Sequence, residues 1–193
     1  AEPEPRRIIQ HSESYKRHGE ISMPGVPASV EVDEAGMVYA ADSEAGVVRM
    51  FDGAAAHANA GTLTGFDGVR AVEEHDGSLY IARVGGDGAI VVRLDAEHEV
   101  QASFTSEALQ EPIGIEVDAR GRVFVCDATA RAVHVLHTAD MSLDSVLGTE
   151  GDVLQRPVAV DTDGEGNVYV ADADAGRVAV FHARDLTFAG SIG

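Results

Sequence analysis

The sequence predicts an all-β protein, a β-propeller made of four tandem copies of a repeat of about 43 residues. Residues 112–127 align without a gap on residues 157–172, and residues 27–42 fit the same frame. A weaker copy lies around residues 77–82. One aromatic residue marks each copy, at spacings of 41, 44 and 45 residues that suit one four-stranded blade: Tyr39, Tyr80, Phe124 and Tyr169.

The third copy shows the four strands expected in each blade. A short apolar strand over residues 114–117 is followed by an Asp-x-x-Gly turn, in which Gly121 can adopt the positive φ that a tight hairpin needs. A second strand over residues 123–126 ends at a polar turn that begins with Asp127. A third strand over residues 132–137 alternates with the strand period, and a fourth near residues 142–147 closes the blade.

The repeat has a recognisable motif. An apolar strand is followed by Asp-x-x-Gly-x-Val-Tyr-Val-Ala-Asp and then by Arg-Val-x-Val-Phe, most strongly at residues 112–136 and 157–181. This pattern covers nearly the whole chain from Pro24 onward and resembles the NHL-repeat β-propeller family. The resemblance implies a fold and leaves the function open, because NHL-like propellers include amidating lyases, other lyases and hydrolases, and protein-binding or RNA-binding modules.

The expected organisation is an N-terminal extension followed by blades. The extension covers residues 1–23 and carries one outer strand at residues 7–11, and the blades cover about 24–65, 66–109, 110–154 and 155–193. Propellers of the resembled family usually close with six blades, which needs roughly 260 residues at this period. The chain is therefore either a small closed ring, an arc of a larger propeller, or an open arc whose edges another protein covers. Uncovered sheet edges promote aggregation, so an open arc implies a partner.

Composition excludes several classes of protein. Acidic residues outnumber basic ones by 33 to 14, and the net charge of −19 argues against a nucleic-acid partner. Arg6, Arg7, Lys16 and Arg17 concentrate near the start, where solvated terminal charges are the favoured interpretation. No apolar stretch is long enough to span a membrane, although peripheral association with a membrane complex stays open. Cys126 is the only cysteine and is expected to be a buried, inert thiol.

The start of the chain bears on the compartment. Ala1 is what either signal-peptide cleavage or removal of an initiator Met leaves, and the sequence does not choose between them. Many bacterial propellers of the resembled kind are secreted, and the polar segment 1–5 suits a mature terminus. We therefore expect a periplasmic or extracellular protein, with a cytoplasmic one as the alternative.

The predicted binding face lies where connections enter the innermost strands and where the second and third strands are joined. Four arginines there are the candidate residues for binding a ligand or partner: Arg70, Arg83, Arg131 and Arg156. Arg83 stands out because it occupies the slot that holds an aspartate in the other copies, beside an extra Gly-Gly-Asp-Gly at residues 85–88. A departure from a structural repeat is a place where function can enter.

Carboxylates and histidines are the candidates for metal or acid–base chemistry. An aspartate recurs at the end of the second strand in three copies: Asp42, Asp127 and Asp172. These carboxylates could bind calcium, act in catalysis or cap the following turn. Their repetition in nearly every blade favours the capping role. The amidating-lyase relatives use histidine-bound zinc near the axis. No histidine of this chain recurs on an innermost strand, so we predict no metal, no cofactor and no catalytic residue; the eight are His11, His18, His57, His75, His98, His134, His137 and His182.

The sequence therefore favours a non-enzymatic protein-binding or scaffolding propeller, an accessory subunit of a larger assembly. The alternative is a metal-dependent lyase or hydrolase that uses the axial face. RNA binding, as in some animal NHL proteins, is disfavoured by the charge.

Overall fold

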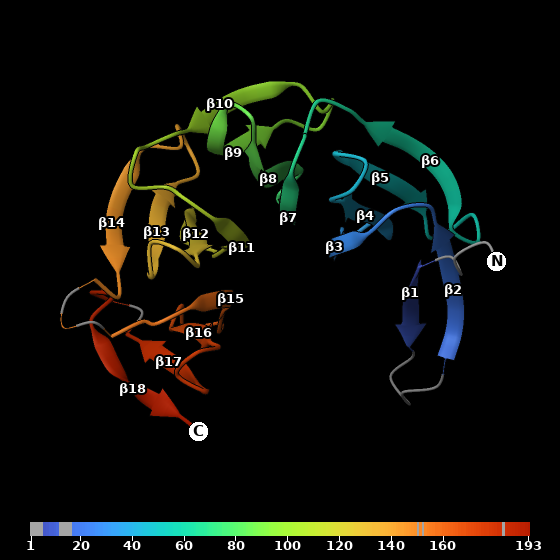
Figure 1. Ribbon diagram of the computed structural model, residues 1–193. Helices are drawn as coiled ribbons and strands as arrows, with labels where there is room; N and C mark the ends of the chain where they lie inside the picture. Colours follow the sequence, from blue (N-terminus) through green and yellow to red (C-terminus); the bar gives the residue numbers. More distant parts are fainter. Residues whose placement is uncertain (1–5, 12–16, 150, 152, 183) are drawn as a thin grey trace.

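The computed structural model describes residues 6–11, 17–149, 151, 153–182 and 184–193, with side chains from Glu20 onward. In this part of the chain the strands form four antiparallel sheets of four strands each and one pair, and there is no α-helix (Figure 1). The pair is β1 (Arg6–His11) and β2 (Arg17–Met23). The first sheet holds β3 (Pro27–Val32), β4 (Met37–Asp42), β5 (Val47–Asp52) and β6 (Ala58–Leu63).

The other three sheets follow in chain order. The second sheet holds β7 (Val69–His75), β8 (Ser78–Gly85), β9 (Gly88–Leu94) and β10 (Val100–Phe104). The third holds β11 (Pro112–Val117), β12 (Arg122–Asp127), β13 (Ala132–His137) and β14 (Leu143–Leu147). The fourth holds β15 (Pro157–Thr162), β16 (Val168–Asp172), β17 (Arg177–Phe181) and β18 (Phe188–Ile192). We call these sheets blades one to four.

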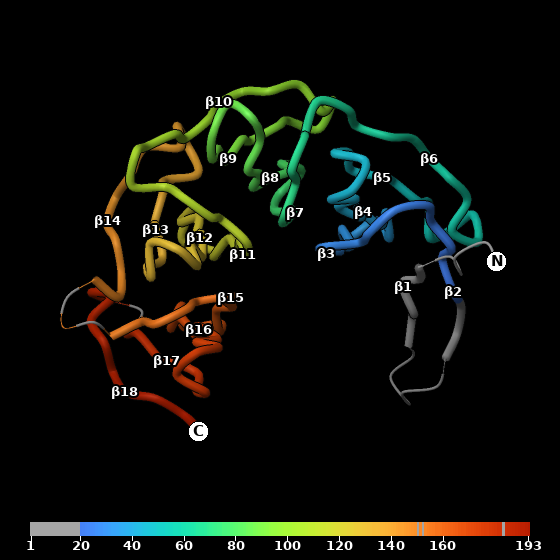
Figure 2. The backbone as a smooth tube through the Cα atoms, in the orientation of Figure 1, coloured from blue at the N-terminus to red at the C-terminus, as the bar shows by residue number. Residues whose placement is uncertain are grey.

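The blades stand side by side along an arc. Strands β3, β7, β11 and β15 lie innermost around the axis, and β6, β10, β14 and β18 lie on the outside (Figures 1 and 2). The sheets do not close into a ring, because a wide gap separates blade four from the β1–β2 pair. The small closed ring, one of the expected alternatives, is therefore not what the structure shows.

The N-terminal extension differs from the expectation of one outer strand. Strands β1 and β2 pair antiparallel, with Ile8 opposite Ile21, and β2 leads directly into the innermost strand of blade one. Sequence reasoning missed β2 because the segment 17–23 lies in no repeat copy.

The hairpin turn between the first two strands is the same in blades one, three and four. In blade three the Asp118 side chain accepts hydrogen bonds from the backbone N–H groups of Arg120 at 3.0 Å and Arg122 at 2.9 Å. Gly121 closes the turn at φ +77°, in the left-handed region where a side chain is strained, which confirms the predicted role of this glycine. Asp33 and Asp163 make the equivalent backbone contacts.

The hydrophobic core lies between blades, because alternate residues of each strand face opposite neighbours. We call the side of a blade toward the preceding blade its leading face and the other side its trailing face. In blade three Val123 and Val125 pack on blade two, while Phe124 and Cys126 pack on blade four. Burial, with a contribution from the charge of Asp127, raises the pKa of the Cys126 thiol, in agreement with the predicted inert thiol.

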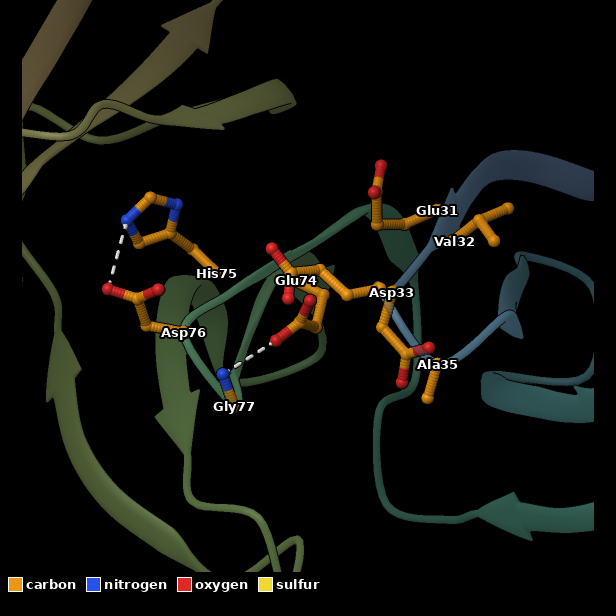
Figure 3. A pocket seen from close by; sticks show the side chains of 9 residues that line it. Glu31, Val32, Asp33, Ala35, Glu74, His75, Asp76 and Gly77 are labelled. Carbon is orange, nitrogen blue, oxygen red and sulfur yellow. Dashed lines mark hydrogen bonds and ion pairs between the residues drawn. The ribbon is translucent and has the colours of Figure 1, made fainter.

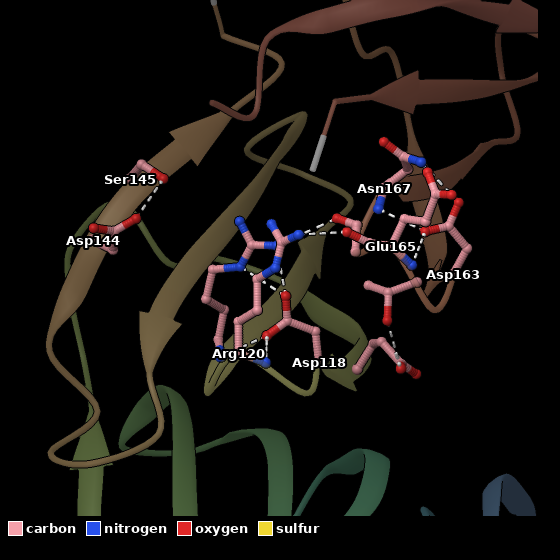
Figure 4. A network of polar contacts seen from close by, with 11 residues as sticks. Asp118, Arg120, Asp144, Ser145, Asp163, Glu165 and Asn167 are labelled. Carbon is pink, nitrogen blue, oxygen red and sulfur yellow. Dashed lines mark hydrogen bonds and ion pairs between the residues drawn. The ribbon is translucent and has the colours of Figure 1, made fainter. Parts of the chain in front are cut away.

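Polar contacts add to this packing at the turn end of the blades. The Arg120 side chain donates to the backbone carbonyl of Glu165 in the next blade at 2.6 Å, and Arg122 donates to that of Gly166 at 3.3 Å (Figure 4). Arg93 of blade two donates in the same way to the Thr138 carbonyl of blade three. These contacts join blade two to blade three and blade three to blade four.

No helix long and apolar enough to cross a membrane occurs among the described residues.

Candidate functional site

The recurring aspartates at the ends of the second strands are buried caps. The carboxylate of Asp127 accepts hydrogen bonds from the backbone N–H groups of Gln110 and Glu111, which enter the innermost strand, and of Ala130 in the following turn. Asp42 and Asp172 occupy the same position and bind the entering segments of their own blades. The capping interpretation is therefore confirmed, and these carboxylates are engaged in holding the blade together.

A basic side chain of the third strand lies beside each of these aspartates. Arg49 pairs with Asp42 at 2.8 Å, Arg177 approaches Asp172 at 3.7 Å, and the buried His134 lies 3.4 Å from Asp127. Burial is the largest single effect on the pKa of Asp42 and raises it, but hydrogen bonds from Ala45 N–H, Arg49 and Val26 N–H outweigh it, so the pKa lies below its usual range.

The pKa of Asp127 is lowered for the same reasons. Burial again acts upward, and the approach of the His134 side chain together with hydrogen bonds from three backbone N–H groups outweighs it. The caps of blades one and three are therefore ionised under ordinary conditions.

Arg83 replaces the capping aspartate in blade two. Its guanidinium forms two hydrogen bonds of 2.7 Å with the carboxylate of Asp87, in the Gly-rich loop that the sequence analysis singled out. These bonds raise the pKa of Arg83 and lower the pKa of Asp87 to about 2. The backbone hydrogen bond from Val84 N–H to the Gly68 carbonyl, at 3.0 Å, still joins this turn to the start of the innermost strand, as the equivalent bond does in the other three blades. Arg83 is thus satisfied by a local partner.

The other three predicted arginines lie at the same end of the arc but do not form one cluster. Arg70 and Arg156 stand where innermost strands begin, and Arg131 precedes the third strand of blade three. All three are exposed. They present separate positive charges on an otherwise acidic molecule.

A second set of residues was missed by sequence reasoning. Each innermost strand carries a carboxylate directly opposite the aromatic marker of the second strand: Glu31, Glu73, Glu116 and Asp161. Because the innermost strands are neighbours around the axis, these four side chains form one row, which we call the inner carboxylate row. The signal was present in the sequence, since an acid recurs at the same place in every copy.

Mutual repulsion and burial perturb the inner carboxylate row. Burial, followed by the charges of neighbouring carboxylates, raises the pKa of Glu73 to about 9 and the pKa of Glu116 to about 7. The pKa of Glu31 is raised as well, first by burial. Glu73 and Glu116 therefore hold protons near neutral pH, a property that acid–base chemistry can use.

A hollow of about 520 Å³ lies at the turn end of the row, between the hairpin turns of blades one and two (Figure 3). Glu31 and Asp33 line it from one side, and Glu74 and Asp76 from the other. Glu74 accepts a hydrogen bond from Gly77 N–H at 2.7 Å, and His75 lies 3.6 Å from Asp76. The hollow is open and acidic, so its chemistry suits a cationic group.

The histidines do not assemble a metal centre. Among the residues that the structure describes, no three His, Cys, Asp or Glu side chains are grouped so that they could hold a metal ion. His134 and His137 lie on β13, and His182 directly follows β17, away from the axis. The side chains of His11 and His18 are outside the described residues. The described residues therefore do not fit the histidine-bound zinc of the amidating lyases.

Comparisons with known proteins show the fold. No family model and no curated protein matches the chain. A chain in the crystal structure of a nidogen/laminin complex is similar at 19% identity and a TM-score of 0.76, over 93% of this chain and 68% of that one. A streptogramin B lyase is similar at 12% identity and a TM-score of 0.76, over 94% of this chain and 60% of the lyase chain. The WD40 β-propeller domain of Doa1 is similar at 16% identity and a TM-score of 0.70, over 86% of this chain and 54% of that one.

The structural similarity shows that the chain has a β-propeller fold. At 12–19% sequence identity it shows neither the family nor the function. The chain spans roughly half to two thirds of the length of these three neighbours.

We predict that Asp127→Asn destabilises the protein by about 2 kcal/mol, because an amide cannot accept all the bonds that the buried carboxylate accepts. Since the folded-state pKa of Asp127 is lowered, its stabilisation is present above the unfolded pKa and is lost as pH falls through the folded value. Urea unfolding at pH 7 and at pH 3 measures both effects. Asp174→Asn, at an exposed position, is the control; equal losses in the two variants contradict the cap.

We predict the opposite pH dependence for Glu73. Its folded-state pKa of about 9 lies above that of the unfolded chain, so folding is favoured by the bound proton and stability falls as pH rises toward 9. Glu73→Gln should therefore raise the unfolding free energy at pH 8.5 by roughly 1–2 kcal/mol and have little effect at pH 4.5. Thermal melts across this pH range test it, with exposed Glu97→Gln as the control. No gain at pH 8.5 is the contrary result.

Proposed function

We propose that this chain is a non-enzymatic, protein-binding propeller unit that serves as an accessory subunit of a larger assembly. One observation carries the proposal: the trailing face of blade four has the residues of an interface between blades, yet none of the described residues covers it. The partner is a protein that completes this packing.

The comparison of equivalent positions makes the point quantitative. Leu147, which pairs with Val133 in blade three, is 5% exposed because blade four covers it. Ile192 holds the same position opposite Val178 in blade four and is 62% exposed. Tyr169 is half-buried, whereas its equivalent Phe124 is fully buried. An apolar face of this kind is a typical protein interaction site.

Other features support the same proposal. One neighbour in fold was solved within a nidogen/laminin complex, and another is a WD40 domain. The Asp-x-x-Gly turns and the strand-end caps support an assignment of the repeats to the NHL type. For the compartment we propose the periplasm or the extracellular space, and peripheral association with a membrane complex is compatible with this proposal; cell fractionation tests the location.

We predict that Ile192→Gln combined with Val178→Gln abolishes stoichiometric recovery of a partner in affinity purification from the source organism. Val100→Gln on the outer strand β10 is the matched control, because it changes an equally exposed valine outside the end face. The proposal is contradicted if the purified chain is a monodisperse monomer whose β18 amides exchange as slowly as those of β14, since the end face then needs no cover.

The second candidate is a metal-dependent lyase or hydrolase that acts on the axial face. The observation that favours it is the inner carboxylate row, in which the pKa of about 7 for Glu116 suits a general acid–base group. A streptogramin B lyase is among the neighbours in fold. Elemental analysis of the native protein tests for zinc or calcium. An enzyme would turn over a substrate from a lyase and hydrolase panel and lose at least about a hundredfold in rate on Glu116→Gln; the scaffold would show no turnover.

A further inference from the structure

A groove of about 330 Å³ lies on the outer side of the arc, between blades three and four. One wall comes from β14 and the other from the end of β17, the turn after it and the start of β18; β14 and β18 lie side by side in Figures 1 and 2. Its volume falls within the range of roughly 300–1,000 Å³ that is usual for ligand pockets. Most of the lining is apolar, and the apolar residues are Val146, Leu147, Val153, Phe181, Leu186 and Phe188.

The equivalent place between blades two and three is filled by an aromatic ring. Strand pairing makes Phe104 of β10 the equivalent of Leu147 of β14. The Phe104 ring reaches across to His134 of blade three, with 6.1 Å between the ring centroids. Met141, which belongs to the same cluster, is 1% exposed, whereas its equivalent Leu186 is only partly buried. An aromatic side chain is therefore the group that the groove between blades three and four lacks.

The wall formed by blade four holds a ring in a fixed position. Phe188 packs edge-on against Phe181 with 5.7 Å between the ring centroids, and the Arg177 guanidinium lies 5.8 Å from the Phe188 centroid. The Phe188 side chain is nevertheless 42% exposed. Because the ring is already ordered, a second aromatic side chain can pack on it with little further loss of conformational entropy.

The backbone of β14 gives the groove a direction. Four consecutive residues of this segment line it, from Ser145 to Gly148, so the groove follows the strand. Among the described strands β14 pairs with β13 alone. Its outer edge therefore offers backbone N–H and C=O groups to an extended segment, which can bind by adding a strand to the sheet.

The charge of the groove favours a basic segment. Asp185 is the one charged residue among the described residues that line the groove, and its carboxylate accepts hydrogen bonds from the N–H and the hydroxyl of Thr187 at 3.1 and 2.7 Å. Asp144 directly precedes the part of β14 that lines it. The whole chain carries a net charge of −19, so a segment with positive charges is attracted to this surface.

We propose that this groove binds an extended basic segment of a partner protein, which adds a strand to the edge of β14 and places an aromatic side chain between Leu147 and Phe188. The site goes beyond the proposed function, because it lies on the leading face of blade four. It involves neither Ile192 nor Val178 of the uncovered trailing face.

The test uses synthetic peptides as probes and the intact protein. The capped peptide Lys-Thr-Phe-Thr-Lys should bind saturably in calorimetry, and hydrogen exchange should show new protection of the β14 amides. Replacing its Phe by Ala should weaken binding by about tenfold or more, because the ring that fills the groove is lost. Replacing both Lys by Glu should weaken it as well, because the charges then repel.

Three protein variants make the result specific. Phe188→Gln changes an exposed residue of the wall, so the fold is retained and the affinity falls by about tenfold or more. Val100→Gln, at the equivalent exposed position of β10, is the matched control and leaves the affinity unchanged. Leu147→Phe copies Phe104 of blade two and should abolish binding by filling the groove.

Three results overturn the proposal: no saturable binding of Lys-Thr-Phe-Thr-Lys at millimolar concentration, equal affinity of Phe188→Gln and the unchanged protein, or a dimer of the free protein that Phe188→Gln dissociates, since the occupant is then a second copy. Ile192→Gln with Val178→Gln should leave the affinity for the peptide unchanged. A failure here is therefore distinct from a failure of the proposed function.

Discussion

The blade depends on one interaction, the buried carboxylate at the end of its second strand. Asp127 fixes the entry to the innermost strand, the turn after the second strand and, through His134, the third strand. These are three segments that hydrophobic packing alone would leave free to slide. A buried charge is tolerated there because backbone N–H groups surround it, and the same bonds keep its pKa low. Blade two has Arg83 at this position instead. The guanidinium of Arg83 forms its hydrogen bonds with Asp87, which lies in a Gly-rich loop that the other blades lack.

Once the blades are formed, the contacts between them follow from alternation along the strands. Each blade has an apolar leading face and an apolar trailing face. Between blades three and four, Arg120 and Arg122 also donate hydrogen bonds to backbone carbonyls across the interface (Figure 4). The same rule produces the uncovered faces at the two ends, because nothing in the sequence of a repeat distinguishes a terminal copy from an internal one. Val30 and Ile192 are exposed on these two faces.

Much of the fold was predictable because four copies of one pattern constrain each other. The aromatic markers, the turn at Gly121 and the cap at Asp127 all followed from aligning the copies. The acids of the inner carboxylate row recur in the same alignment, but their mutual repulsion could not be read from it. Glu73 and Glu116 are 43 positions apart in the chain and interact because innermost strands become neighbours around the axis. Strand β2 was missed because it belongs to no copy. The predicted arginines remain untested as a binding site, and the Arg83 partner Asp87 lay within reach of sequence reasoning, four residues away.

The open arc also sets where the molecule is weakest. In a repeat array, stability is close to a sum of terms for each unit and for each interface with a neighbour. Blades two and three each bury two faces, whereas blade four buries one and the β1–β2 pair is only half a blade. Cooperative unfolding should therefore proceed inward from both ends toward a central two-blade unit. A ring has no such ends, so fraying is a property that this chain acquires from its open geometry and loses when both ends are covered.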